Sequence, residues 1–243
     1  MSKDNLMLSI ILPAFNEGHR LLDSLQKIMT AVAGVTSGFE IIIVDDGSSD
    51  DTLAKAKSME GPAVKVIGYA PNKGKGYAVK KGILAARGRY RLFMDVDLAT
   101  SLESIGEFVK LIEAGNADII IGDRKSDMNR QIIPQPFSRQ FFGAGFTMLS
   151  RLLLNCRVND FTCGCKLFTD EACETVFSRQ RIDRWAFDSE ILFIAQKHGL
   201  RILESPVIWR HQHNSKVRLF KDIFTSLMGL LEIRLNDAKG LYQ

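Results

Sequence analysis

Two aspartates separated by one valine, Asp95-Val96-Asp97, carry the clearest chemistry in this chain of 243 residues. They directly follow a mostly apolar segment, Tyr90–Met94, that predicts a strand. Carboxylates at positions i and i+2 beyond a strand end can converge on one hard cation, and Mg²⁺ or Mn²⁺ is held by one or two carboxylates together with substrate phosphates. The motif therefore predicts a metal site that neutralises a departing diphosphate. The alternative is a pair of solvated acids in a turn.

A second acidic segment follows the apolar run Phe39–Val44. Its first two carboxylates, Asp45 and Asp46, can accept hydrogen bonds from a nucleobase edge or from ribose hydroxyls. Ser48 and Ser49 are the alternatives for the N-cap of the helix that should follow. We expect both roles together, with ligand binding at Asp46 and capping by the residues after Gly47.

A glycine- and lysine-rich turn, Asn72–Gly76, opens a predicted helix over Lys75–Ala86. Backbone N–H groups at such a turn and the side chain of Lys75 can meet phosphate. The turn lacks the spacing of a Walker loop, and no GxGxxG follows the first strand. A dinucleotide-dependent oxidoreductase therefore loses its main support.

These motifs lie in the first half of the chain, where apolar runs alternate with helix-like segments. The predicted strands are Leu8–Ala14, Phe39–Val44, Val64–Gly68, Tyr90–Met94 and Asp118–Ile121, and the predicted helices are Glu17–Val32, Ser49–Lys57, Lys75–Ala86 and Leu102–Glu113. This alternation indicates βαβ units on a parallel sheet. Each motif comes at the carboxyl end of a strand, where open α/β sheets bind ligands.

The second half has a different pattern. It predicts long helices over Gln140–Leu154 and Lys216–Leu235, with a turn-rich segment Asp160–Cys165, a helix Ala186–Lys197 and a strand Ile202–Ile208 between them. No repeat or low-complexity linker separates the halves. We therefore predict a single α/β domain over residues 1–243, with a Rossmann-like, mostly parallel sheet flanked by helices and with amphipathic helices in the C-terminal part.

Composition and charge narrow the function further. Lys plus Arg is 32, Asp plus Glu is 28 and 46% of residues are hydrophobic, which excludes a disordered chain. Residues 1–123 hold 14 basic and 16 acidic side chains, whereas residues 124–243 hold 18 and 12. The basic second half implies an anionic partner. Its basic residues are dispersed among apolar stripes, so we expect phosphate or a membrane surface and no nucleic acid.

No apolar run approaches the ~20 residues of a transmembrane helix, and no secretory leader is evident. The two long helices carry apolar stripes with basic flanks, within residues 141–153 and 220–231. Such stripes can lie in a bilayer interface, cover the core, or form a face between two copies of a homo-oligomer. We expect a cytoplasmic protein that associates peripherally with the cytoplasmic face of a membrane. Cys163 and Cys165 are expected to pack, and His211 and His213 to be surface residues.

Taken in order, the motifs resemble those of family 2 glycosyltransferases with a GT-A fold. The matching segments are Pro13-Ala14-Phe15-Asn16-Glu17, Val44-Asp45-Asp46-Gly47-Ser48, Asn72-Lys73-Gly74 and Asp95-Val96-Asp97. In the second half, residues 160–168, 185–190 and 214–217 are similar to the dolichyl-phosphate β-glucosyltransferase branch, to which the dolichyl-phosphate mannose synthases are related. At Cys165 the sequence departs from that branch, which usually has Phe.

The resemblance implies an inverting enzyme that moves glucose from UDP-glucose to a polyprenyl phosphate. A GDP-mannose-dependent polyprenyl-phosphate mannose synthase, or another family 2 enzyme with a different sugar or acceptor, is the alternative. A nucleotide-sugar half over residues 1–123 would be followed by an acceptor and membrane-facing half over residues 124–243. A catalytically inactive membrane scaffold would not need the intact Asp95 and Asp97 pair.

The resemblance also implies roles for single residues. The nucleotide sugar would be bound by Pro13, Ala14, Asn16, Glu17, Asp45, Asp46, Lys75 and Val96, Mg²⁺ or Mn²⁺ by Asp95 and Asp97, and the acceptor phosphate by Arg124, Arg139 and Lys216. Asp188 would position the sugar or serve the structure. A phosphomonoester has a second pKa near ~6 and is already a nucleophilic dianion at neutral pH. The transfer reaction would then depend mainly on cations that bind the two anionic substrates, rather than on a strong base.

Overall fold

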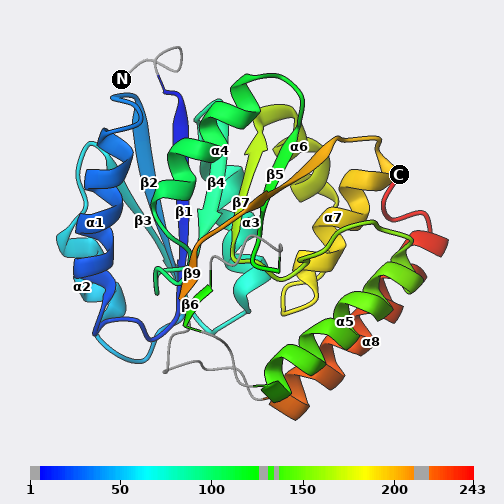
Figure 1. Ribbon diagram of the computed structural model, residues 1–243. Helices are drawn as coiled ribbons and strands as arrows, with labels where there is room; N and C mark the ends of the chain where they lie inside the picture. Colours follow the sequence, from blue (N-terminus) through cyan, green and yellow to red (C-terminus); the bar gives the residue numbers. More distant parts are fainter. Residues whose placement is uncertain (1–5, 126–130, 134–136, 211–218) are drawn as a thin grey trace.

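A computed structural model describes residues 6–125, 131–133, 137–210 and 219–243, and it describes the backbone alone at 131–133, 137–142, 144 and 219–224. At its centre is a seven-stranded sheet in the order β3-β2-β1-β4-β7-β5-β8 (Figure 1). The strands are β1 (Leu8–Ala14), β2 (Phe39–Asp46), β3 (Val64–Tyr69), β4 (Tyr90–Met94), β5 (Ile119–Asp123), β7 (Cys165–Thr169) and β8 (Ile202–Pro206). Neighbouring strands pair in parallel except at β7, which is antiparallel to both β4 and β5. The predicted mostly parallel α/β sheet is confirmed.

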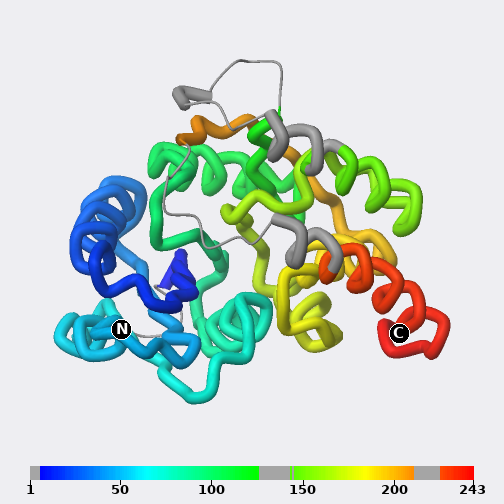
Figure 2. Tube along the Cα trace, turned by 90° about the horizontal axis from the view of Figure 1, so that it is seen from below, coloured from blue at the N-terminus to red at the C-terminus, as the bar shows by residue number. Residues whose placement is uncertain are grey.

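Helices cover both faces of this sheet. They are α1 (Leu21–Ala33), α2 (Thr52–Ser58), α3 (Lys75–Ala85), α4 (Glu103–Glu113), α5 (Phe137–Leu154), α6 (Asp170–Arg179), α7 (Phe187–Lys197) and α8 (Leu219–Ala238). Successive side chains of β1 enter different layers, because the side-chain period of a strand is two. Ile10 packs with residues of α1 and α4, whereas Ile11 packs with residues of α3 and α7. Seen from below, α4 and α3 lie on opposite sides of the sheet (Figure 2).

The approach of α3 to the sheet depends on Gly82. A Cβ atom at this position would lie 2.4 Å from Cγ2 of Ile11 in β1 and 3.0 Å from Cγ2 of Val44 in β2. No larger residue fits without moving the helix away from these two strands. Glycine therefore sets the distance at which the first residue of α3, Lys75, reaches the carboxyl ends of the strands.

The structure contains elements that the sequence did not predict. Strand β7 begins at Cys165, at the end of the segment predicted as turn-rich, and α6 follows it immediately. The hydroxyl of Thr169 accepts a hydrogen bond from Ala172 N at 3.2 Å and caps α6. Two acidic residues in the first turn stabilise the helix by interacting with the positive end of its dipole. A second sheet pairs β6 (Gln131–Ile133) with β9 (Trp209–Arg210).

Helices α5 and α8 lie side by side (Figure 1). Some of their apolar side chains face the core and others face solvent. Leu230 of the predicted α8 stripe is fully buried, and Leu149 and Leu227 pack against the same core. Leu230 therefore covers the core, which is one of the three roles that the sequence left open for this stripe. Among the described side chains of this helix pair, the exposed large hydrophobic ones are Met148, Leu152, Met228, Leu231 and Leu235. No helix within the described part of the chain is long and apolar enough to cross a bilayer.

Candidate active site

The carboxyl ends of β1, β2 and β4 bring the predicted nucleotide-binding residues to one edge of the sheet. Ala14, which ends β1 after Pro13, is the register partner of Asp45 at the end of β2. Strand β4 pairs with β1 on its other side, and Asp95 follows β4 directly. The residues predicted from separate motifs therefore lie on neighbouring strand ends.

Hydrogen bonds join the loop after β1 to the loop after β2. Asn16 has a φ of +53°, a conformation that asparagine tolerates better than most residues. Its N–H donates to Ser48 Oγ at 2.9 Å, and its Oδ1 accepts from Ser49 N at 2.8 Å. Glu17 N donates to Thr52 Oγ1 at 2.8 Å. The predicted N-cap at Ser48 or Ser49 is wrong, because α2 begins only at Thr52 and both serines are used to hold Asn16.

Asp46 shapes the loop that leads into α3. Its carboxylate accepts hydrogen bonds from Asn72 Nδ2 at 2.8 Å, Lys73 N at 2.8 Å and Gly74 N at 2.9 Å. Gly74 has a φ of +113° and lies so close to Asp183 that a Cβ atom would be 2.6 Å from its carbonyl oxygen. Both oxygens of Asp46 are thus used by the loop, and the side chain organises the entry to α3.

Asp45 is buried beside it and has a different set of contacts. Its Oδ2 accepts from Ser48 N at 3.1 Å. Its Oδ1 is buried and accepts no hydrogen bond from the part of the chain that the structure describes. A buried carboxylate oxygen is costly without a donor, which makes Asp45 Oδ1 a candidate acceptor for a ligand N–H or O–H group.

Asp95 and Asp97 form an acidic pair next to the start of α3. The ammonium of Lys75 lies 2.6 Å from Asp95 Oδ1, and Asp97 Oδ1 accepts from Ala99 N at 3.0 Å. Burial and then the charge of Asp95 raise the pKa of Asp97. Burial favours the neutral form of Lys75, but the carboxylates of Asp95, Asp188 and Asp97 outweigh it and raise the pKa of this lysine. Between Asp97 and Ala99 the chain turns through Leu98, which has a φ of +52°.

This pair has the donor chemistry of a site for Mg²⁺ or Mn²⁺. Both side chains offer hard oxygen ligands, and their mutual repulsion is what a divalent cation relieves. No group of three or more His, Cys, Asp or Glu side chains suited to a metal occurs among the described residues. Substrate oxygens and water would therefore complete the coordination, as is usual for Mg²⁺ bound with a nucleotide.

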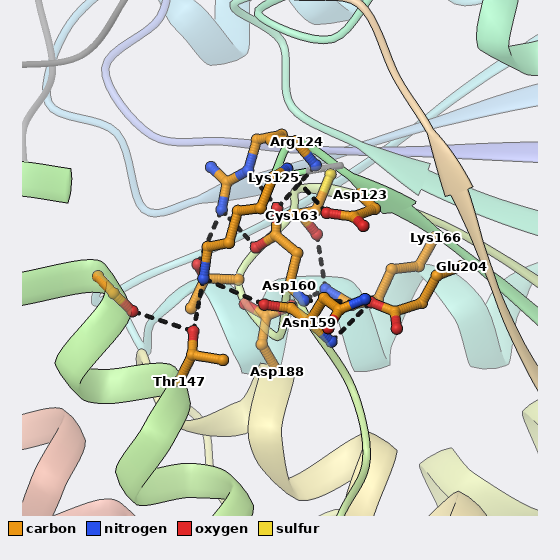
Figure 3. A network of polar contacts seen from close by, with 12 residues as sticks. Asp123, Arg124, Lys125, Thr147, Asn159, Asp160, Cys163, Lys166, Asp188 and Glu204 are labelled. Carbon is orange, nitrogen blue, oxygen red and sulfur yellow. Dashed lines mark hydrogen bonds and ion pairs between the residues drawn. The ribbon is translucent and has the colours of Figure 1, made fainter. Parts of the chain in front are cut away.

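Gly164, directly before β7, packs against Asp95, whereas Lys166 within β7 contacts Cys163 and Asp188. Figure 3 shows Lys166 beside Asp188. A Cβ atom at Gly164 would lie 2.0 Å from Asp95 Oδ2, so only glycine allows this close contact. Lys166 is fully buried, and its ammonium contacts Cys163 O at 2.6 Å and Asp188 Oδ1 at 2.5 Å. Sequence reasoning missed Lys166, although a single charge inside the apolar run CKLF was the available signal.

Arg124 extends from the end of β5 onto a buried carboxylate (Figure 3). Its Nε lies 2.6 Å from Asp160 Oδ2 and its Nη2 lies 2.7 Å from Oδ1, while Nη2 also donates to Thr162 Oγ1 at 2.9 Å. Burial favours the protonated form of Asp160, but the charge and hydrogen bonds of Arg124 lower its pKa to about 2. The predicted phosphate ligand is therefore also part of a buried ion pair.

Lys125 links this edge to α5. Its ammonium donates to Thr147 Oγ1 at 2.5 Å and to Asn159 O at 3.1 Å (Figure 3). Burial lowers the pKa of this lysine, and Arg124 contributes in the same direction. Because Thr147 belongs to α5, Lys125 ties the helix that carries Arg139 to the end of β5.

Several predictions lie beyond what the structure describes. The backbone of Arg139 belongs to α5, but its side chain is not described, and Lys216, His211 and His213 lie outside the described residues. The prediction that Cys163 and Cys165 pack is confirmed, because both are buried, as are Cys156 and Cys173. Burial raises the pKa of Cys163 to about 11, which makes it a poor nucleophile.

Comparison with known proteins adds independent findings. Residues 9–177 match the family model described as Glycosyl transferase family 2. A dolichyl-phosphate beta-glucosyltransferase of Dictyostelium discoideum is 33% identical over 253 residues, covering 99% of this chain and 77% of the relative. The human protein of the same name is 32% identical over 252 residues, covering 97% of this chain and 77% of the relative.

A solved structure has the same fold at low sequence identity. It is glucosyl-3-phosphoglycerate synthase from Mycobacterium tuberculosis, in complex with Mn²⁺, UDP-glucose and phosphoglyceric acid. The TM-score is 0.69 with 17% identity, and the match covers 95% of this chain and 80% of that chain. At this identity the likeness establishes the architecture, and its ligands are those of the mycobacterial enzyme.

Proposed function

The chain belongs to glycosyl transferase family 2, and from this membership we propose that it transfers glucose from UDP-glucose to a polyprenyl phosphate of the dolichyl type. The proposal is supported by the names of the relatives that match nearly the whole chain, which share one donor sugar and one acceptor class. The mycobacterial enzyme with the same fold was solved with UDP-glucose, which supports the choice of donor.

The observation that carries the proposal is the acidic pair beside Lys75, with the Lys75 ammonium 2.6 Å from Asp95 Oδ1. Two carboxylates and one ammonium at the ends of parallel strands suit a diphosphate and a divalent cation. We propose that Asp95 and Asp97 hold Mg²⁺ or Mn²⁺, while Val96 between them in the sequence is buried. When bound, such a cation neutralises the charge of the departing UDP.

The nucleoside would lie against the ends of β1 and β2. In this proposal the buried Oδ1 of Asp45 accepts a hydrogen bond from the base or the ribose, because it has no donor in the described chain. The segments Pro13–Ala14 and Asn16–Glu17 form the adjoining wall, held by the bonds to the loop after β2. Asp46 acts indirectly by fixing the loop that carries Lys75.

The acceptor phosphate needs cations more than it needs a base. A phosphomonoester is a dianion at neutral pH, so it can attack the sugar without losing a proton to the protein. We propose that Arg139 and Lys216 bind this dianion, with Arg124 contributing from its ion pair with Asp160. Asp188 is held by Lys166 at 2.5 Å and is proposed to position the sugar. The dense cation set would bring two anionic substrates together.

A lipid acceptor implies contact with a membrane. The exposed side chains Met148, Leu152, Met228, Leu231 and Leu235 form the apolar face of the α5–α8 pair and are the proposed contact. We propose that the protein works at the cytoplasmic face of the membrane, where nucleotide sugars are made available. We also propose that its two halves form one domain, because both supply strands to one sheet. A second copy of the chain is the alternative occupant of this face.

A donor screen tests the proposed function. Purified protein is given Mn²⁺, a short polyprenyl phosphate and one radiolabelled nucleotide sugar at a time. We expect label in the lipid phase with UDP-glucose and little with GDP-mannose or UDP-galactose. Preferential transfer from GDP-mannose would replace the proposal by a mannose synthase, and transfer from neither donor would contradict it.

A further inference from the structure

Lys75 occupies a position that is unfavourable for a lysine in an isolated helix. It is the first residue of α3, whose first turn contains no acidic residue. A cation at a helix N-terminus meets the positive end of the helix dipole and is destabilising there. The ammonium is instead stabilised from outside the helix, by Asp95 Oδ1 at 2.6 Å. The ion pair therefore offsets an unfavourable placement, which indicates that the lysine serves something other than the helix.

We propose that Lys75 is an exchangeable counter-ion of Asp95: it occupies the carboxylate in the free protein and moves to the diphosphate when a nucleotide binds. As a result, a nucleoside diphosphate and a divalent cation would bind cooperatively, and the cation alone would bind weakly. This inference rests on the proposed function, since it concerns the same nucleotide and metal site.

The geometry makes Lys75 and a divalent cation competitors. The ammonium lies 2.6 Å from Asp95 Oδ1, whereas Mg²⁺ would take a carboxylate oxygen at about 2.0–2.1 Å. A cation on that oxygen would be held against the positive charge of the ammonium. A diphosphate removes the conflict, because its oxygens give Lys75 a new anionic partner and give the metal further ligands.

The contacts of Lys75 hold it less rigidly than those of the neighbouring cations. Its side chain is 21% exposed and that of Asp95 is 38% exposed, so both partners are partly accessible to solvent. Lys166 is fully buried between Asp188 and Cys163 O, and the fork of Arg124 is fixed on both oxygens of Asp160. A lysine ammonium is a point charge on a flexible stem, which can change partners without a fixed bidentate geometry.

The test measures Mn²⁺ binding by the free-ion EPR signal, with and without UDP, for the wild type and Lys75→Gln. Lys73→Gln is the matched control, because it removes the same charge two residues before Lys75, from an ammonium that contacts Tyr77. In the wild type we expect UDP to tighten Mn²⁺ binding about tenfold or more, within the usual range of about 5–150-fold for coupled sites. In Lys75→Gln we expect Mn²⁺ alone to bind about tenfold more tightly and the effect of UDP to shrink below about threefold. Lys73→Gln should behave as the wild type.

The outcomes separate this inference from the proposed function. If the wild type binds UDP with Mn²⁺ and Lys75→Gln binds Mn²⁺ alone no more tightly than the wild type, the counter-ion role is wrong and the proposed function stands. An equal gain in Lys73→Gln would also contradict it, because the effect would then reflect net charge. If the wild type binds no UDP in the presence of Mn²⁺, the proposed function and the inference both fail. Thermal unfolding of each variant verifies that the fold is kept.

Discussion

Arg124 and Asp160 form a two-point ion pair, with Nε 2.6 Å from Oδ2 and Nη2 2.7 Å from Oδ1. The backbone N–H of Arg124 donates to the same carboxylate at 3.1 Å, and Asp160 is fully buried. An arginine at the end of β5 is thereby joined to the segment that leads into β7. The pair makes Arg124 a structural residue as well as a candidate phosphate ligand.

Arg124 and Arg139 are therefore expected to differ on mutation. Arg124→Ala leaves a buried carboxylate unpaired and should lower the free energy of unfolding by about 3–5 kcal/mol. Arg139→Ala should instead raise the acceptor KM roughly ten- to a hundredfold with UDP binding intact, since a lost charge-assisted bond costs about 1.5–3 kcal/mol. Urea unfolding and acceptor kinetics check the two effects. An unchanged stability of Arg124→Ala would show that the ion pair contributes little.

The same pair predicts a dependence of stability on pH. The folded pKa of Asp160 is about 2, below the value of about 3.9 for an unfolded aspartate. A lowered pKa means that its stabilisation is complete above about pH 4 and is lost as the pH falls toward 2, with a total near 2–3 kcal/mol. Urea unfolding between pH 5 and pH 2 should show a flatter profile for Asp160→Asn than for the wild type. Parallel profiles would contradict the shift.

Tyr242 is predicted to stabilise α7 through Glu190. Its hydroxyl donates to Glu190 Oε1 at 2.6 Å, and Glu190 also accepts from Arg181 N and Ile182 N at 2.9 Å each. Tyr242→Phe removes the donor from a buried carboxylate and should cost about 1–3 kcal/mol, which lowers Tm by several degrees. Tyr77→Phe is the control, because that hydroxyl contacts the exposed Lys73 ammonium. Equal Tm values for the two variants would exclude the role of the Glu190 contact.

The apolar face of the α5–α8 pair is predicted to contact lipid. Replacing Met228, Leu231 and Leu235 by Gln should reduce binding to anionic liposomes several-fold and lower activity on long-chain acceptors. Activity on a short, water-soluble polyprenyl phosphate should remain, because these side chains are exposed and lie on α8. Leu84→Gln is the control, since Leu84 is 50% exposed on α3. If the triple variant loses dimers instead of liposome binding, the face is occupied by a second copy.

The parallel part of the sheet could be predicted because its strands are short apolar runs that end in polar motifs. Strand β1 was predicted at Leu8–Ala14, as observed, and Asp95-Val96-Asp97 follows the carboxyl end of β4, as predicted. Strand β7 could not be predicted in the same way. It enters between β4 and β5 from far along the chain, and its first residue, Cys165, belongs to the segment that the sequence predicts as turn-rich.

The hydrogen-bond and packing partners of single side chains could not be predicted from the spacing of residues in the sequence. Asp46 and Asp45 are adjacent, yet one is used by the loop before α3 and the other keeps a buried acceptor without a partner in the described chain. Leu230 and Leu231 are also adjacent, yet one is core and the other is 46% exposed. Helical spacing identifies an apolar face, but its width does not say where the core ends, because that boundary depends on how the helix packs.

The central claim is metal-dependent glucosyl transfer at Asp95 and Asp97, and one measurement tests it most directly. Wild type, Asp97→Asn and the exposed control Asp23→Asn are incubated with Mn²⁺, radiolabelled UDP-glucose and a short polyprenyl phosphate, and label is counted in the lipid phase. Asp97→Asn keeps the size of the side chain and removes one metal carboxylate, so we expect its transfer to fall by about a hundredfold or more. We expect Asp23→Asn to be as active as the wild type, and EDTA to abolish transfer by both. Transfer by Asp97→Asn at the wild-type rate, or undiminished transfer in EDTA, would contradict the account.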